Sequence, residues 1–430
     1  MRWMKLRPWM LGLALPLLAF LGVSFKLGWR HFFVPGTTTD GHHLMEESCN
    51  SCHSPFAGVS NDRCSGCHRA ELAGDTHPPA LFDDPRWAAD LEKMDVSSCA
   101  TCHAEHHGAK KSVTVPRDFC FACHSDMAER ASHRGFAPAT CGNAGCHNYH
   151  DGSVLRQETL AAHQGEPDLL AAYGVPARVL PAVASRTKIE TPDPPAGLAA
   201  PQDMVAAWRR SAHARAGVTC SSCHERSGRL VQQPAREVCR SCHGFEADTF
   251  LAGKHGLRTR LGLSALRPRD ARLPMKAEAV AGPRHLDCAT CHDPHSVDTR
   301  AAARQACLGC HDDRHSRSFA SSPHARTAGP AADGRWGPRD VTCATCHLPR
   351  MKLGGAGGLR VAVNHNNSLT LSPPDRMAAM VCGFCHGLEF SLASLLDQAL
   401  GENNFSGHPK GGLKSFIMLN SAAAPAAKGR

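Results

Sequence analysis

Residues 49–53 read CNSCH, an arrangement of two cysteines, two intervening residues and a following histidine. It recurs along the chain, which has 430 residues, 22 cysteines and 28 histidines. Every cysteine belongs to such a pair, although CGNAGCH (residues 141–147) has four intervening residues. In chain order, motifs 1 to 11 are Cys49, Cys52 and His53; Cys64, Cys67 and His68; Cys99, Cys102 and His103; Cys120, Cys123 and His124; Cys141, Cys146 and His147; Cys220, Cys223 and His224; Cys239, Cys242 and His243; Cys288, Cys291 and His292; Cys307, Cys310 and His311; Cys343, Cys346 and His347; and Cys382, Cys385 and His386.

C-x-x-C-H is the attachment motif of c-type haem. Its two thiols bond covalently to one porphyrin edge, and the adjacent histidine becomes the proximal ligand of the iron. We therefore expect eleven covalently attached haems c, with the cysteines of motifs 1 to 11 as attachment points and their histidines as proximal ligands. The longer spacer of motif 5 can form a bulged loop, so this motif is included.

Two other uses of paired cysteines fit the sequence less well. Zinc ribbons also contain C-x-x-C pairs, but their ligand sets do not require a histidine directly after the second cysteine. A disulfide scaffold would show varied spacings rather than eleven nearly identical ones. The regular cysteine–histidine pattern favours haem over both alternatives.

The composition predicts the fold class. Hydrophobic residues make up 42% of the chain and aromatic residues 6%, which is a small supply for a conventional core. If planar cofactors replace part of that core, the fold is a mainly α, loop-rich multihaem cytochrome fold with little strand. We expect helices over residues 85–94, 202–215 and 388–400.

The motifs fall into two groups. Five lie between Cys49 and His147, six lie between Cys220 and His386, and residues 174–202 in the gap are rich in proline and alanine. We predict a five-haem module over residues 40–165, a linker over 166–202 and a six-haem module over 203–430. The alternative is a long surface loop within one continuous haem array.

The N-terminus has the pattern of a membrane anchor. Arg2, Lys5 and Arg7 precede an uncharged, mainly apolar stretch over residues 8–25, which is about the length that spans a bilayer. We expect an uncleaved signal anchor over residues 1–34, with a cleaved secretory signal as the alternative. By the positive-inside rule, a single-pass protein of the bacterial inner membrane would then carry its haem domain in the periplasm.

The net charge does not indicate a nucleic-acid partner. The chain has a formal charge of +9, but eleven haems would add 22 propionates, and each ferric bis-histidine core would add one positive charge. The loaded protein would thus be slightly negative. The basic excess is explained by compensation of propionates.

Histidines outside the motifs are the expected distal ligands, because there are enough of them for every iron to be bis-histidine. Four follow a proximal histidine by three or four residues and should each reach a neighbouring haem: His106, His150, His295 and His315. The full set of candidates is His42, His77, His106, His133, His150, His163, His213, His255, His285, His295, His315, His324 and His365.

Longer segments resemble two cytochrome groups. Residues 40–150, with DGHHLMEESCNSCH, CATCHAEHHG and CGNAGCHNYHDG, resemble class III multihaem cytochromes. Residues 203–430 are similar to the pentahaem nitrite reductase and octahaem hydroxylamine oxidoreductase superfamily, through WRRSAHARAGVTCSSCH, CATCHDPHS, CHDDRHSRSFASSPHA and CHGLEFSLASLLD. The nitrite reductases have a C-x-x-C-K motif and the hydroxylamine oxidoreductases a haem-linked tyrosine in the C-terminal half. This chain has no C-x-x-C-K motif, and its two tyrosines, Tyr149 and Tyr173, precede that half.

These features predict an electron-transfer protein more than a catalyst, and no catalytic residue is assigned. Bis-histidine iron has no open position, which suits electron conduction between the membrane quinone pool, or a membrane partner, and a periplasmic or extracellular redox partner. A quinol-oxidising membrane subunit is one expected partner, and nucleic acid is not. The alternative is a reductase or oxidase of small nitrogen or sulfur compounds with one open-site haem.

Overall fold

The computed structural model describes residues 8–26, 34–54, 57–69, 71–108, 113–130, 133–134, 136–141, 149–150, 162–163, 166, 192–326, 340–354, 360–371 and 374–412. Short helices and loops dominate these residues, and their strands form three two-stranded antiparallel hairpins. The prediction of a mainly α, loop-rich fold with little strand is confirmed for this part of the chain.

The N-terminal part, meaning the described residues between 34 and 166, consists of short elements around motifs 1 to 5. Its α-helices and strands are β1 (His53–Ser54), β2 (Gly58–Val59), α2 (Asn61–His68), α3 (Ala88–Lys93) and α4 (Cys99–Cys102). Its 3₁₀ helices are η2 (His43–Met45), η3 (Cys49–Ser51), η4 (Pro79–Asp83), η5 (Pro85–Trp87), η6 (Phe119–Ala122), η7 (Ser125–Glu129) and η8 (Pro138–Thr140).

The C-terminal part, meaning the described residues between 192 and 412, has more helix. Its α-helices are α7 (Gln202–Arg210), α8 (Ala212–Arg215), α9 (Cys220–His224), α10 (Arg236–Arg240), α11 (Gly244–Ala252), α12 (Leu257–Arg260), α13 (Ala277–Ala281), α14 (Cys288–Cys291), α15 (Thr299–Ala303), α16 (Gln305–Leu308), α17 (Arg314–Ser318), α18 (Pro323–Arg326), α19 (Cys343–His347), α20 (Pro374–Met380), α21 (Leu388–Leu396) and α22 (Gln398–Glu402). The remaining elements are β3 (Glu225–Arg226), β4 (Arg229–Leu230), β5 (Arg350–Leu353), β6 (Arg360–Val363), η9 (Pro268–Asp270), η10 (Phe319–Ser321) and η11 (Cys382–Phe384).

All three predicted helices form, but each is divided into two elements. Residues 85–94 become η5 and α3, residues 202–215 become α7 and α8, and residues 388–400 fall in α21 and α22. The breaks in the last two have a local cause. Ser211 and Asp397 are extended, and their side chains accept from the backbone N–H groups of Ala214 and Leu400 at 3.2 and 3.0 Å. Such residues stabilise a new helix start in place of a continuous helix.

Several cysteine motifs begin directly after a residue that organises the helical turn. The backbone N–H of Thr342 donates to Thr345 Oγ1 at 3.0 Å before motif 10. The same local bond joins Asp287 to Thr290 before motif 8 and Thr219 to Ser222 before motif 6. In each case the second partner lies between the two cysteines. The motif's own intervening residue therefore helps to hold its thiols on one turn.

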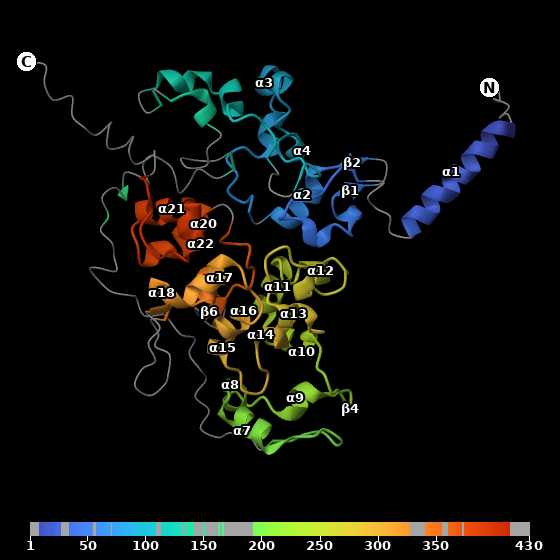
Figure 1. The fold of residues 1–430 in the computed structure, drawn as a ribbon, viewed down its shortest axis with the longest axis vertical. Helices are drawn as coiled ribbons and strands as arrows, with labels where there is room; N and C mark the ends of the chain where they lie inside the picture. The colour runs from blue at the N-terminus through green and yellow to red at the C-terminus, as the bar shows by residue number, and fades with distance from the viewer. Residues whose placement is uncertain are drawn as a thin grey trace, which may run out of the picture.

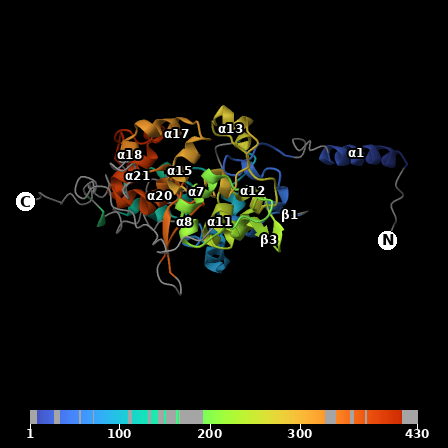
Figure 2. The same ribbon diagram turned by 90° about the horizontal axis from the view of Figure 1, so that it is seen from below.

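The N-terminal helix α1 (Pro8–Lys26) projects away from the rest of the molecule in both views (Figures 1 and 2). Its described side chains include Leu15, Leu17 and Leu18, which are exposed. No helix within the described residues is both long and apolar enough to cross a membrane. A helix forms where the anchor is predicted, but the predicted transmembrane helix is not supported by this part of the chain.

The N-terminal part lies against the C-terminal part, with η2 in contact with α12 (Figure 1). The buried guanidinium of Arg258 is central to this junction. It donates to Leu44 O and to Glu47 Oε2, both at 3.0 Å. Since α12 provides this arginine and η2 includes Leu44, the two elements are joined by a hydrogen bond as well as by packing.

Three further arginines of the C-terminal part make polar contacts across the junction. Arg260 donates to Gly66 O at 2.9 Å, and Arg376 donates to Glu71 O at 2.8 Å. Arg272 forms ion pairs with the carboxylates of Asp40 and Glu46. The module and linker boundaries stay a prediction, now with a defined contact surface between the two parts.

Candidate haem-binding sites

Ten pairs of histidine rings are the main feature of the described structure. In each pair one ring is the predicted proximal ligand of a motif and the other lies outside the motifs. The ring centres are 5.9 to 6.3 Å apart. We call the pair at motif N site N. The pairs are His53 with His106, His68 with His42, His103 with His150, His124 with His77, His224 with His295, His243 with His213, His292 with His365, His311 with His255, His347 with His315, and His386 with His324.

This spacing fits an iron atom held between two imidazoles. Imidazole nitrogens bind metals at about 2 Å and lie about 1 Å from the ring centre, so two rings on opposite sides of one metal have centres about 6 Å apart. Stacked rings in direct contact would be closer, and in each of the ten pairs one ring is the histidine of a cysteine motif. The cysteines of each motif adjoin one ring of each pair, as covalent c-type haem requires.

Four of these pairs join different motifs. The distal rings of sites 1, 3, 6 and 10 follow motifs 3, 5, 8 and 9, so a proximal histidine is faced by a ring from beside another motif. Because such a residue cannot return to the iron of its own motif, each of these motifs helps to build a neighbouring site. If these rings ligate iron as predicted, the sites depend on one another for their ligands.

The predicted attachment cysteines lie on single turns of the chain. Cys67 is in α2 and Cys346 is in α19, while the backbone N–H groups of Cys242 and Cys385 donate to the carbonyls of Cys239 and Cys382 at 3.2 and 2.9 Å. Residues three apart on such a turn share one face, which brings the two thiols of a motif to the same side.

None of the described cysteines is in a disulfide, and their side chains are exposed or half-buried. Among the second cysteines of the motifs, for example, Cys67 and Cys242 are exposed, and Cys346 and Cys385 are half-buried. The described residues thus give no support to a disulfide scaffold, and haem attachment at these thiols stays a prediction.

Motif 5 and three predicted distal ligands stand apart from the ten pairs. Cys146 and His147, the second cysteine and the proximal ligand predicted for motif 5, lie outside the described residues, so both assignments stay predictions. The three distal candidates are placed as follows: His163 Nδ1 is 2.6 Å from Glu166 Oε1, His285 Nδ1 is 3.3 Å from Arg267 Nε, and the backbone N–H of His133 donates to Arg130 O at 2.9 Å.

Backbone carbonyls contact the outer nitrogen of a ring at five sites, which fixes the orientation of that ring. The Nδ1 atoms of His106, His77, His224, His365 and His315 lie 2.6 to 3.0 Å from the carbonyls of Gly36, Tyr149, Val231, Val363 and Gly401. These are sites 1, 4, 6, 8 and 10.

At sites 2 and 3, carboxylates contact the outer ring nitrogen where those five sites have a backbone carbonyl. His42 Nδ1 is 2.7 Å from Glu105, His68 Nδ1 contacts Glu71, and His150 Nδ1 is 3.1 Å from Asp75. In the C-terminal part, Asp293 and Asp313 lie farther from their rings, at 3.8 Å from His295 and 3.9 Å from His311. Sequence reasoning missed these acidic residues, since nothing in the motifs marks them.

Burial keeps several of the rings in the form that binds metals. Burial, followed by the charge of a neighbouring histidine, lowers the pKa of His255 and of His347 to about 4. The pKa values of His213, His292 and His324 are lowered for the same first reason. A neutral imidazole has the lone pair that a metal needs.

Consecutive motifs are neighbours in space. Cys288 and Cys307 each donate a hydrogen bond to a thiol of a neighbouring motif, and this bond, followed by burial, raises the pKa of both. At other cysteines burial comes first in raising the pKa, and the charge of a neighbouring thiol adds to it. The neighbouring thiols are Cys52 and Cys64, Cys64 and Cys99, Cys102 and Cys120, Cys223 and Cys239, Cys239 and Cys288, Cys291 and Cys310, and Cys307 and Cys343. Sites 1 to 4 and sites 6 to 10 therefore form two ordered series.

Two aromatic side chains connect sites further. The Tyr149 ring stacks on His77 of site 4 at 4.4 Å between ring centres and meets His150 of site 3 at 5.2 Å. Phe405 contacts His315 of site 10 and His324 of site 11 at 6.1 and 6.2 Å. Site 11 is thereby joined to the end of the second series.

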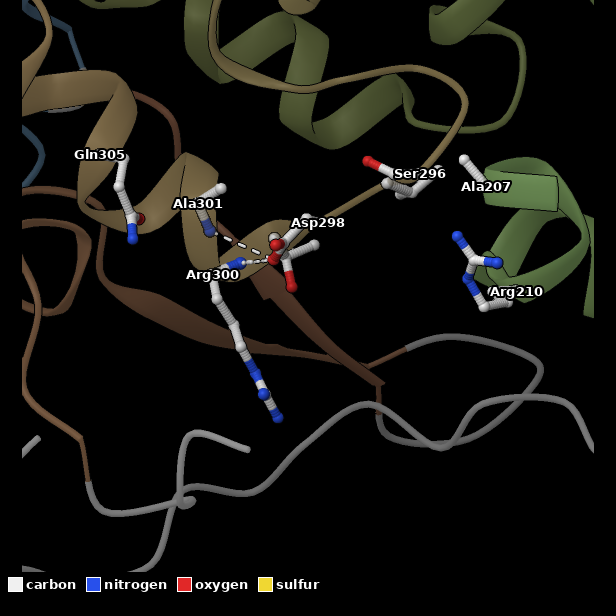
Figure 3. Close-up of a pocket in the computed structure, with 9 residues that line it drawn as sticks. Ala207, Arg210, Ser296, Asp298, Arg300, Ala301 and Gln305 are labelled. Carbon is white, nitrogen blue, oxygen red and sulfur yellow. Dashed lines mark hydrogen bonds between the residues drawn. The ribbon is translucent and has the colours of Figure 1, made fainter. Parts of the chain in front are cut away.

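A cavity of about 470 Å³ lies beside site 6, lined by α7, by α15 and by the loop after His295. Figure 3 shows Arg210 on one side, with Ser296, Asp298 and Arg300 on the other. Asp298 accepts from the backbone N–H groups of Arg300 and Ala301, which begins α15 at the cavity wall. Arg210 and Arg300 contribute two positively charged side chains to the residues that line this cavity.

No bare-metal site accompanies the pairs: among the residues described here, no three or more His, Cys, Asp or Glu side chains are grouped to hold a metal ion. The residues present instead fit c-type haem: the two cysteines of a motif would hold the porphyrin, and the two rings of a pair would hold its iron. When bound, this group supplies an iron that accepts and donates one electron reversibly.

Comparison with known proteins shows a similarity to a curated multihaem protein. The chain is 26% identical over 290 residues to nine-heme cytochrome c of Desulfovibrio desulfuricans, covering 60% of this chain and 80% of the relative. No family model and no solved structure matches. The relative, the cysteine motifs and the ring pairs together support a multihaem c-type cytochrome. Neither the class III resemblance nor that to the nitrite reductase superfamily is established by this match.

Proposed function

We propose that the chain is a membrane-anchored undecahaem c-type cytochrome that conducts electrons between the membrane quinone pool, or a membrane partner, and a periplasmic or extracellular redox partner. The carrying observation is the set of ten histidine pairs. An iron between two histidines has both axial positions filled, so it transfers electrons without binding a substrate. The match to a nine-haem cytochrome supports the same role.

The order of the sites supports conduction over distance. Neighbouring thiols and shared aromatic contacts place sites 1 to 4 in one series and sites 6 to 11 in another. The contact of η2 with α12 brings the two series together, because His42 of site 2 caps η2 and His255 of site 9 lies two residues before α12. Electrons would enter one part and leave from the other.

EPR of the fully haem-loaded ferric protein tests this function, recorded with and without nitrite, hydroxylamine or cyanide. We expect only low-spin signals that the added ligands do not change, together with eleven haems per chain by pyridine haemochrome assay and intact mass. A high-spin component that converts on adding a ligand would identify an open iron. That outcome would replace conduction with the alternative, a multihaem reductase or oxidase of small nitrogen or sulfur compounds.

The membrane location is proposed from residues 1–34, on the basis of Arg2, Lys5 and Arg7 before an apolar segment and of the exposed leucines of α1. The haem domain would then face the periplasm of a bacterial inner-membrane protein. Fractionation with alkaline carbonate checks this placement. We expect the full chain in the membrane pellet and a chain lacking residues 1–34, secreted by a cleavable signal, in the soluble periplasm. A full chain released by carbonate would contradict the anchor.

A further inference from the structure

Site 2 differs from the neighbouring sites in what contacts its two rings. Glu105 Oε1 lies 2.7 Å from His42 Nδ1, and Glu71 contacts Nδ1 of His68 on the opposite side of the site. A carboxylate therefore lies behind both of its axial rings. Site 3 has such a partner in Asp75 on His150, while sites 1, 4, 6, 8 and 10 have a backbone carbonyl at one ring.

The contacts of Glu105 and Glu71 are built into the fold. The backbone N–H and Oγ1 of Thr39, a buried residue, donate to the two Glu105 oxygens at 2.7 and 2.8 Å. Glu71 follows shortly after α2, three residues beyond His68. Thr39 thus holds Glu105 against the His42 ring, and the short chain between His68 and Glu71 keeps the second carboxylate at its ring.

A carboxylate that accepts the outer N–H of a ligating histidine makes the imidazole more basic. A more basic ligand, with negative charge beside it, stabilises ferric iron over ferrous iron and lowers the reduction potential. We propose that Glu71 and Glu105 are potential-setting residues that give site 2 a lower reduction potential than sites 1, 3, 4, 6, 8 and 10. This inference rests on the haem loading in the function proposed above.

Because site 2 lies at the junction, its lower reduction potential would affect electron transfer between the two parts. His42 caps η2, which contacts α12 across the junction, and Arg376 donates to the backbone carbonyl of Glu71 at 2.8 Å. An electron that passes between the two parts by way of site 2 would take an uphill step there. Site 2 would then limit transfer between the parts while each series equilibrates within itself.

Positive groups near the site act in the opposite direction without cancelling the effect. The guanidinium of Arg376 bonds to a backbone oxygen, and that of Arg258 is paired with Glu47 at 3.0 Å. Neither of these bonds reaches an axial ring, whereas each carboxylate contacts one directly. The carboxylates at the rings therefore dominate.

A potentiometric titration of the holoprotein, followed by EPR and visible spectra, tests the proposal with Glu71→Gln and Glu105→Gln. We expect both variants to raise the midpoint potential of the same low-potential component, and the double variant to raise it further. Asp75→Asn should raise a different component that lies at higher potential. Glu47→Gln is the matched control, because it removes a junction carboxylate that contacts Arg258 and not a ring.

Haem content and low-spin EPR of each variant separate a failure of this inference from a failure of the proposed function. If Glu105→Gln does not load fully, Glu105→Asp keeps the charge on a shorter side chain and should give a smaller upward shift. The proposal is overturned if the two glutamine variants move different components or none, or if Glu47→Gln moves the same component as far.

Discussion

The N-terminal and C-terminal parts reach the same ligand geometry by different means. Sites 1 to 4 and sites 6 to 11 have histidine pairs at the same spacing. Of the described residues, the N-terminal part has one buried hydrophobic side chain, Leu44, whereas the C-terminal part has fourteen. Carboxylates of the N-terminal part contact axial rings at sites 2 and 3, while Asp293 and Asp313 of the C-terminal part stand 3.8 and 3.9 Å from theirs.

This difference shows which forces hold each part. Burial of apolar side chains stabilises a domain at about 25 cal/mol per Å², and the N-terminal part has little of it. If the predicted histidines ligate iron, the N-terminal part would be stabilised mainly by iron–histidine bonds and covalent haem, as in small domains that fold only with their metal. The C-terminal part has a side-chain core in addition, including Trp208, Phe319 and Leu392.

The largest expected effect comes from removing one haem attachment in each part. Cys120→Ser with Cys123→Ser at site 4 should leave the N-terminal part open to protease, because few buried side chains remain to hold it. Cys307→Ser with Cys310→Ser at site 9 should leave much of the C-terminal part resistant. Limited proteolysis with mass spectrometry measures both. Equal protease resistance of the two parts would contradict the proposed difference in what stabilises them.

Removing a buried apolar side chain should destabilise the C-terminal part more than the N-terminal part. Leu392, 3% exposed in α21, lies in the apolar core of the C-terminal part. Leu392→Ala should cost about 3 kcal/mol of unfolding free energy, since it removes buried methyl groups and leaves a cavity. Leu44→Ala should cost less, because Leu44 is the one buried hydrophobic side chain among the described residues of the N-terminal part. Denaturant unfolding of the holoprotein, monitored by near-UV CD, compares them, and a larger cost for Leu44→Ala would contradict this view.

The smallest expected effect concerns the junction. Arg258→Ala should cost about 1 to 3 kcal/mol, because it leaves Leu44 O and Glu47 without their buried donor. Arg240→Ala is the matched control, since the Arg240–Asp248 pair is exposed on both sides and should contribute under about 1 kcal/mol. Thermal unfolding measures both, and hydrogen exchange at η2 should rise only for Arg258→Ala. Equal losses of stability in the two variants would show that Arg258 does not stabilise the junction.

The sequence alone predicted the motifs, the helical and loop-rich class and the positions of the three longer helices, because these depend on local patterns. It also predicted that histidines such as His106 and His315 would reach neighbouring motifs, and the structure places them against His53 and His347. It could not pair each ring with its partner. Rings such as His292 and His365 are far apart in the chain, with other candidates between them, and only the folded chain brings them together.

Other features were beyond sequence reasoning for the same physical reason. Glu105 contacts His42 across 63 residues, and Arg258 reaches Leu44 across 214. A glutamate in a loop or an arginine on a short helix has no periodicity that reveals such a partner. Gly36 is a further case, because a Cβ there would lie 2.1 Å from the carbonyl oxygen of His106, which only the folded chain reveals.

The most direct test of the central claim is the position of iron in the holoprotein. An anomalous difference map collected at the iron edge from crystals of the fully loaded protein would locate each atom. We expect one iron between the two rings of every pair, from His53 with His106 to His386 with His324. Iron bound on one side only, with the second ring turned away, would contradict the account and restore an open site as the centre of the protein's chemistry.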